Sequence, residues 1–120
     1  PDCGATWLLP RLVGRAKAME MALLGDKLSA TDAELLGLVD RTVQAEQLFG
    51  AAKAAALRLA NQPTRALVET RRLFDAAQRS EFEPALRAES RAQSQLGFAH
   101  DYSEGVAALM QKRAPKFDDR

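Results

Sequence analysis

The chain has 120 residues, the length of one domain, and its apolar content of 47% is typical of a globular protein rather than a disordered one. Its 17 basic and 16 acidic residues are interspersed and leave a net charge of +1. This balance excludes the general basic field that attracts nucleic acid or an anionic membrane. No apolar run approaches the ~20 residues that a membrane span needs. We therefore expect neither nucleic acid nor a membrane among its partners.

Cysteine and histidine are too few for a metal centre or a disulfide framework. Cys3 is the single cysteine and His100 the single histidine, whereas a structural zinc site usually takes four such ligands. An intrachain disulfide is excluded, and a lone thiol fits a reducing compartment. We expect no metal site and a cytoplasmic location.

The residue choice favours helices from the start of the chain. Alanine is abundant, β-branched residues are sparse, and no Asn-Gly or Asp-Gly hairpin turn occurs. Residues 4–13 form a short apolar segment in which Pro10 is expected to break or kink a long helix. Residues 14–24 carry a helical apolar stripe, and Gly25 is a natural C-terminal stop.

A short helix and a short strand are predicted next. Ser29, followed three residues later by Asp32, is a weak capping box that opens a helix ending at Gly37. Residues 38–43 (LVDRTV) are the only segment with strand character. An unpaired strand leaves its backbone groups unsatisfied. We therefore expect this strand to pair with sequence outside the chain or with another chain.

The second half of the chain is predicted to be helical throughout. Four further helices are expected, over 45–61, from Pro63 onward, over 81–97, and from the Asp101-x-x-Glu104 motif to Pro115. In the second of these we expect four apolar residues to face inward: Leu67, Val68, Phe74 and Ala77. The fold class is thus mainly α with one short strand.

Three segments taken together carry a resemblance. They are residues 1–14 (PDCGATWLLPRLVG), residues 22–30 (ALLGDKLSA) followed by Gly37-Leu38-Val39, and residues 101–106 (DYSEGV) continuing through 112–117 (KRAPKF). In this order and spacing the chain resembles the C-terminal half of the enoyl-CoA hydratase/isomerase (crotonase) superfamily. It is most similar to the ring-1,2-epoxyphenylacetyl-CoA isomerase branch of phenylacetate breakdown. The resemblance runs over essentially all 120 residues.

The resemblance implies a division of the chain and a set of partners. Residues 1–43 would be the end of the crotonase core, and residues 44–120 a helical C-terminal oligomerisation region that builds trimers, often stacked as hexamers. Members bind acyl-CoA thioesters and hold an enolate-like oxyanion with two backbone N–H groups. In the family both donors lie N-terminal to the segment present here. The 120 residues alone are therefore expected to be inactive, and no cofactor is expected because CoA is part of the substrate.

Asp2 is the catalytic candidate. In isomerases and dehalogenases of the superfamily, an aspartate just before the P-x-x-G helix faces the acyl group and acts as base, acid or nucleophile, and Asp2 fills that position. The chemistry needs a carboxylate held close to the carbon that loses or gains a proton. The alternative is that Asp2 caps the following helix. The two roles are compatible.

Two pairs of residues are candidates for substrate binding. Trp7 and Leu8 stand where the family commonly has Gln-Arg, and an apolar pair suits a pocket for a bulky or aromatic acyl group; the alternative is core packing. Lys112 aligns with a lysine that reaches a CoA phosphate in family members, sometimes across a subunit boundary. Leu109 replaces the phenylalanine that relatives often place against the adenine. The alternatives are that Lys112 is a solvated cation at the helix end, or that Arg113 or Lys116 replaces it.

Two functions follow. The first is a C-terminal fragment of an acyl-CoA isomerase or hydratase that acts by proton transfer around a thioester enolate. The second is a non-catalytic helical oligomerisation module. Both predict exposed apolar surface where the other half of the parent protein would sit, and self-association or repacking to cover it.

Overall fold

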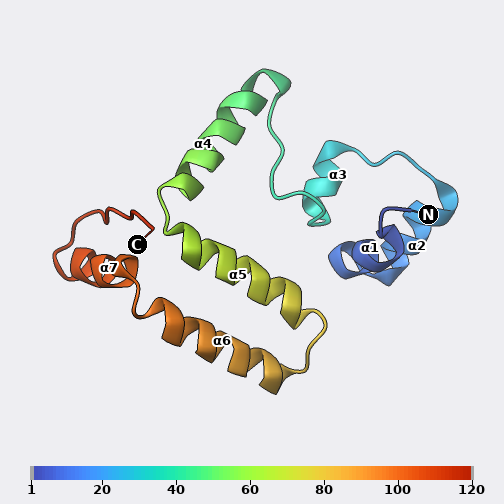
Figure 1. Ribbon diagram of the computed structural model, residues 1–120. Coiled ribbons are helices and arrows are strands. Elements are labelled where there is room, and N and C mark those ends of the chain that lie inside the picture. Colours follow the sequence, from blue (N-terminus) through green and yellow to red (C-terminus); the bar gives the residue numbers. More distant parts are fainter. Residues whose placement is uncertain (1, 120) are drawn as a thin grey trace. The chain divides into compact units, whose positions relative to one another are not determined.

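The computed structural model describes residues 2–119. Within them the regular elements are seven α-helices and one 3-10 helix, and no strand (Figure 1). The mainly α prediction is confirmed. The chain divides into two compact units, one ending at Phe49 and one beginning at Gly50, and each is described here by itself.

The first unit is built on two short helices joined by one glycine. Helix α1 (Ala5–Val13) packs against α2 (Arg15–Leu24), and Gly14 between them has φ 79° and ψ 157°, a backbone conformation that L side chains rarely adopt. Helix α1 runs through Pro10 rather than ending there. Because Pro10 lies in the last turns, its missing N–H removes one hydrogen bond and leaves the helix otherwise intact.

Helix α3 (Ala30–Leu35) begins and ends as its sequence predicts. The Ser29 hydroxyl accepts a hydrogen bond from the Asp32 N–H at 3.0 Å and donates one to the Asp32 carboxylate at 2.6 Å. At the other end Gly37 has φ 72°. The Gly37 N–H bonds to the Glu34 carbonyl, and the Leu38 N–H bonds to the Ala33 carbonyl at 2.8 Å. This pair of bonds is a Schellman motif, with glycine at its left-handed position.

The strand predicted at residues 38–43 is wrong. No residue of this segment pairs with another strand in the part of the chain that the structure describes. Its first N–H groups, from Leu38 and Val39, bond instead to the Ala33 carbonyl of α3, and the Thr42 N–H donates to the Glu34 carboxylate at 2.8 Å. These bonds satisfy the backbone locally, so the segment needs no partner strand.

The second unit contains most of the remaining helices. The 3-10 helix η1 (Ala45–Gln47) leads into α4 (Leu48–Ala60), in whose first turn the boundary between the units falls. Helices α5 (Thr64–Ala77) and α6 (Phe82–Leu96) lie antiparallel, side by side, in Figure 1. Helix α7 (His100–Met110) follows, and residues 111–119 run back beside it (Figure 1). All the helices predicted for this half are present.

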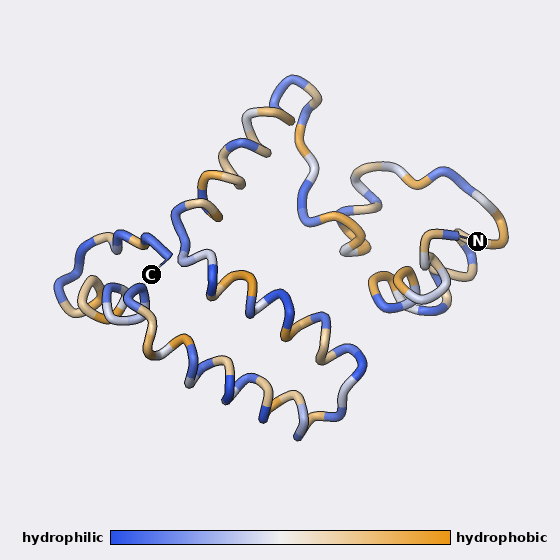
Figure 2. Tube along the Cα trace, in the orientation of Figure 1, coloured by the Kyte–Doolittle hydropathy of each residue, from blue (hydrophilic) through white to orange (hydrophobic). Residues whose placement is uncertain are grey.

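Apolar side chains in both units are largely exposed. The buried apolar residues among those described are four alanines: Ala18, Ala33, Ala92 and Ala108. The prediction that Val68 and Phe74 face inward is wrong, because they are 58% and 71% exposed. Ala77 is also exposed, and Leu67 is half-buried. Figure 2 shows apolar residues recurring among polar ones along α5 and α6. Because α6 is the main packing partner of α5, much of the α5 surface stays uncovered.

This exposure is the apolar surface that the sequence predicts. The largest exposed fractions belong to Phe98, Leu35, Phe49, Met110, Leu109 and Phe82. Within residues 2–119, no helix combines the length and the apolar character that crossing a membrane requires.

The cap of α3 can be tested by one substitution. Replacing Ser29 by alanine leaves the Asp32 N–H without its acceptor, so we expect Ser29→Ala to lower the free energy of unfolding by about 1 kcal/mol. Urea unfolding followed by circular dichroism measures the change. Ser103→Ala is the control, because Ser103 is exposed within α7 and caps no helix. Equal stability of Ser29→Ala and the wild type would contradict the cap.

Candidate functional site

Asp2 lies three residues before Ala5, the first residue of α1, and is exposed. Its backbone carbonyl accepts a hydrogen bond from the Ala5 N–H at 2.9 Å. The cap position of α1 is Gly4, which has φ 78°, and no side chain caps the helix. The capping alternative for the Asp2 side chain is therefore wrong. Among the described residues no side chain bonds to its carboxylate, which stays available to a ligand.

Trp7 and Leu8 lie on the exposed side of α1, with 39% and 47% of their surface accessible. The Arg11 guanidinium lies 4.0 Å above the centre of the Trp7 ring and donates a hydrogen bond to the Trp7 carbonyl at 2.8 Å. A cation over the face of an indole is attracted to the ring, which favours this arrangement of the two side chains. Core packing within this unit does not account for either residue, because neither is buried in it.

Lys112 occupies an unusual backbone position at the end of α7. Its φ is 53°, in the left-handed region that favours glycine. The Lys112 N–H bonds to the Leu109 carbonyl at 3.1 Å, and the Arg113 N–H bonds to the Ala108 carbonyl at 3.0 Å. These two bonds form a second Schellman motif, with lysine at the left-handed position. The Lys112 side chain is exposed and forms no ion pair with a described residue.

Leu109 borders an apolar pocket of the second unit. The pocket has a volume of about 340 Å³ and lies among the start of α5, the end of α6, one face of α7 and Phe117 of the tail. Leu109 itself is 78% exposed. Its apolar neighbours in the lining are Leu96, Tyr102, Val106 and Phe117. The lining is largely apolar, which suits an apolar group.

Glu104 joins α7 to the tail by three hydrogen bonds. The Arg113 guanidinium donates to both carboxylate oxygens, at 2.6 and 2.8 Å, and the Lys116 N–H donates at 2.7 Å. The Arg113 side chain, followed by the Lys116 N–H, lowers the pKa of Glu104 from its usual 4.5 to about 2. The same pair raises the pKa of Arg113. Arg113 is thus paired with Glu104, whereas Lys112 forms no ion pair within the part of the chain that the structure describes.

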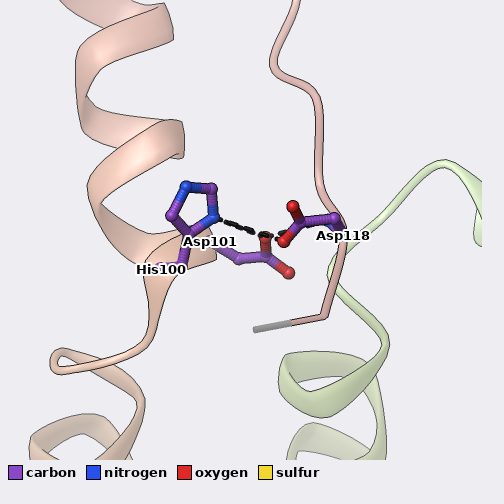
Figure 3. A group of neighbouring side chains, drawn as sticks. All are labelled: His100, Asp101 and Asp118. Atoms are coloured by element: carbon purple, nitrogen blue, oxygen red, sulfur yellow. Dashed lines mark hydrogen bonds and ion pairs between the residues drawn. The ribbon is translucent and has the colours of Figure 1, made fainter.

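Asp101 fixes the end of the tail in a similar way (Figure 3). Its carboxylate is buried and accepts hydrogen bonds from the Asp118 N–H at 3.0 Å and the Asp119 N–H at 2.9 Å. The His100 Nδ1 lies 3.3 Å from Asp118 Oδ1 and 3.6 Å from Asp101 Oδ1. Ligand atoms of these three residues lie within 4.8 Å of one another. Both Asp101 oxygens are already occupied by N–H donors, so the cluster serves the tail.

The sequence motif at the start of α7 therefore has a different role from the one predicted. The Asp101-x-x-Glu104 pattern was expected to begin the helix, but the cap position is Ala99 and no side chain caps it. Asp101 and Glu104 instead bind backbone N–H groups of the tail. The only sequence signal for this would have been an arginine nine residues after Glu104, a spacing that no local rule singles out.

The candidate residues fall into two groups. Asp2, Trp7 and Leu8 belong to the first unit, where they lie at or next to the start of α1. Leu109 and Lys112 belong to the second unit and are three residues apart at the end of α7. Both groups were proposed from the family resemblance rather than from a local sequence rule.

A comparison with known proteins identifies the family. A model of the enoyl-CoA hydratase/isomerase family matches residues 1–120. The chain belongs to this family. The 1,2-epoxyphenylacetyl-CoA isomerase of Escherichia coli K12 is 43% identical over 117 residues, which are 98% of this chain and 45% of that protein.

Solved structures of the enoyl-CoA hydratase/isomerase family agree with the fold. An enoyl-CoA hydratase subunit of Geobacillus kaustophilus is 33% identical and superposes with a TM-score of 0.95, covering all of this chain and 47% of that one. An enoyl-CoA hydratase of Bacillus anthracis is 28% identical with a TM-score of 0.94, over 100% of this chain and 46% of that one. The chain therefore spans about half the length of the relatives it matches.

The Glu104 clamp predicts a pH dependence of stability. Since the pKa of Glu104 is about 2 when folded and near 4.5 when unfolded, the ionised carboxylate contributes its full stabilisation above 4.5 and loses it as the pH falls toward 2. We expect the stability difference between the wild type and Glu104→Gln to shrink across this window. Urea unfolding at a series of pH values measures it.

Glu83→Gln is the matched control for this experiment. Glu83 pairs with Arg87 at 3.1 Å on the exposed surface of α6, where 78% of the Glu83 side chain is accessible. Exposed pairs of this kind contribute little to stability. A stability difference for Glu104→Gln that did not change between pH 4.5 and 2 would contradict the clamp.

Proposed function

We propose that this chain is part of an acyl-CoA isomerase or hydratase that moves a proton around a thioester enolate. The observation that carries the proposal is the family match over all 120 residues, joined to the exposed carboxylate of Asp2, which forms no hydrogen bond or ion pair with residues 3–119 and lies shortly before α1. The proposed substrate class is an acyl-CoA thioester. No cofactor is proposed, because CoA enters as part of the substrate.

In this proposal Asp2 is the proton carrier. Its carboxylate removes a proton from the carbon beside the thioester carbonyl, and the electron pair of the broken C–H bond moves onto the carbonyl oxygen. The resulting enolate takes the proton back at a different carbon, which completes an isomerisation. The position supports this role, because Gly4 occupies the cap position of α1 and the Asp2 side chain does not cap the helix.

The enolate oxygen needs two fixed N–H donors. The family resemblance assigns both to sequence N-terminal to the segment present here. We therefore propose that the 120-residue chain does not turn over substrate by itself.

Trp7 and Leu8 are proposed to contact the acyl group. They lie one to two turns of α1 beyond Asp2, and the Arg11 guanidinium holds the indole from one face. An exposed indole and an isobutyl group suit a bulky or aromatic acyl chain. The isomerase of Escherichia coli that this chain resembles is named for a bulky ring-bearing thioester, 1,2-epoxyphenylacetyl-CoA.

Lys112 and Leu109 are proposed to bind the CoA portion. An exposed ammonium that forms no ion pair with a described residue suits a phosphate. Leu109 and the apolar pocket beside it offer a surface for the adenine ring.

The catalytic role is tested by Asp2→Asn in the full-length gene product. The amide cannot accept the proton, so we expect the exchange of the α-protons of phenylacetyl-CoA with deuterated water to fall by at least about 100-fold. Mass spectrometry follows the exchange. Asp26→Asn is the control, since Asp26 is exposed in the loop after α2. Full exchange by Asp2→Asn would remove Asp2 from the mechanism.

A second function is favoured by the exposed apolar side chains. A non-catalytic helical module would cover them by assembling into trimers or hexamers, and Val68 and Phe74 on α5 are available for such a contact. The proposed enzyme would assemble in the same way. A measurement of catalytic activity therefore distinguishes the enzyme from the non-catalytic module, whereas a measurement of association does not.

Association can be measured on the 120-residue chain by analytical ultracentrifugation. We expect Phe74→Asp to raise the dissociation constant at least about tenfold, because burying a phenylalanine contributes most of the contact. Gln78→Asp, which adds the same charge at an exposed polar position one turn away, is the control. A monomeric wild-type chain would contradict the proposed assembly.

A further inference from the structure

The end of α7 departs from the pattern that the same chain uses elsewhere. Two helices, α3 and α7, end in a Schellman motif with the same two backbone bonds. The left-handed position is Gly37 after α3, with φ 72°, and Lys112 after α7, with φ 53°. Glycine takes this conformation without a steric penalty, whereas a side chain with a Cβ is strained there. A lysine in this position therefore indicates that its side chain has a role besides ending the helix.

A strained turn persists only when its surroundings hold it. The residue after Lys112 is Arg113, whose guanidinium is held by both oxygens of Glu104. Glu104 also accepts the Lys116 N–H, and the Phe117 ring lies against Gly105 on the same helix. The chain that leaves Lys112 is therefore tied to α7 within four residues.

The tail is fixed again at its far end. Asp101 accepts the N–H groups of Asp118 and Asp119, and the Asp119 carboxylate accepts the Thr64 N–H at the start of α5 at 2.6 Å. Lys112 thus lies between the α7 helix on one side and a tail anchored at two places on the other. Such anchoring restricts the conformations open to the turn.

The charges around the turn separate the two neighbouring cations. Arg113 forms a two-bond pair with Glu104, whose side chain is only 14% exposed. Lys112 is exposed and has no ionic partner among residues 2–119. Because Arg113 neutralises Glu104, that carboxylate does not compete for the Lys112 ammonium.

We propose that Glu104 is a positioning residue, which acts through Arg113 to hold Lys112 in the left-handed turn where its ammonium meets a CoA phosphate. The inference rests on the proposed function. It adds a role for a residue that touches no substrate.

A double-mutant cycle tests the proposal. Binding of coenzyme A to the full-length gene product is measured by isothermal titration calorimetry. We expect Glu104→Gln and Lys112→Gly each to weaken binding about tenfold, the effect of losing one hydrogen bond to a charged group. In the double variant we expect no further loss beyond that of Lys112→Gly, because Glu104 then has no lysine to position.

Two features separate positioning from a general structural role. Lys112→Gly relieves the strained turn, so we expect its melting temperature to equal or exceed that of the wild type while CoA binding falls. Arg113→Lys keeps the charge but loses the two-bond fork, and we expect it to weaken binding without unfolding the protein. If Glu104→Gln fails to fold, CoA binding by Arg113→Lys still tests the positioning role. Glu83→Gln is the control and should bind as the wild type.

A readout without CoA keeps the inference distinguishable from the proposed function. Loss of the clamp should speed hydrogen exchange of the Arg113 N–H, which closes the turn, by about tenfold or more. Unchanged exchange in Glu104→Gln, or a CoA affinity that falls further in the double variant than in Lys112→Gly, would overturn the positioning role alone. A wild-type protein that binds no coenzyme A would overturn the proposed function and this inference with it.

Discussion

In the segments that follow α3 and α7, side-chain carboxylates accept hydrogen bonds from backbone N–H groups. The Glu34 carboxylate accepts the Thr42 N–H, Glu104 accepts the Lys116 N–H, and Asp101 accepts two N–H groups of the tail. A backbone donor that finds no partner is costly, and no sheet is present within residues 2–119 to supply one. Hydrogen bonds to the ionised form also lower a carboxyl pKa, as they do for Glu34 and Glu104.

These polar contacts matter because apolar packing is thin. The buried apolar residues of the described chain are alanines, and each packed pair of helices covers only one side of its members. The shape of each unit therefore depends on caps, turns and carboxylate clamps to an unusual degree. This also explains why the left-handed Lys112 is compatible with a stable turn: three hydrogen bonds to Glu104 compensate for it.

The helices could be predicted from sequence because their signals are local. Apolar periodicity, Ser29 before α3 and glycine after α2 and α3 mark their bounds. The strand at residues 38–43 was predicted from residue type alone, and tertiary contacts with Glu34 overrode it. The prediction that Val68 and Phe74 of α5 face inward was wrong, because periodicity identifies an apolar face of a helix but does not show whether another element covers that face. Asp2 and Lys112 were proposed from the resemblance, and their roles stay predictions, whereas the partnership of Glu104 with Arg113 depends on a turn that only the structure shows.

Because the buried apolar residues of the described chain are alanines, these positions should tolerate few substitutions, and Ala108 is an example. It is 1% exposed, and its carbonyl accepts the Arg113 N–H that closes the turn before the tail. A larger side chain there would have to separate α7 from its surroundings and would disturb that bond as well. Leucine and phenylalanine positions on the open faces, by contrast, tolerate exchange within each unit. Within each unit, then, we expect substitutions to be tolerated least at the small buried alanines. In a protein whose core is built from large side chains, the large positions are the least tolerant.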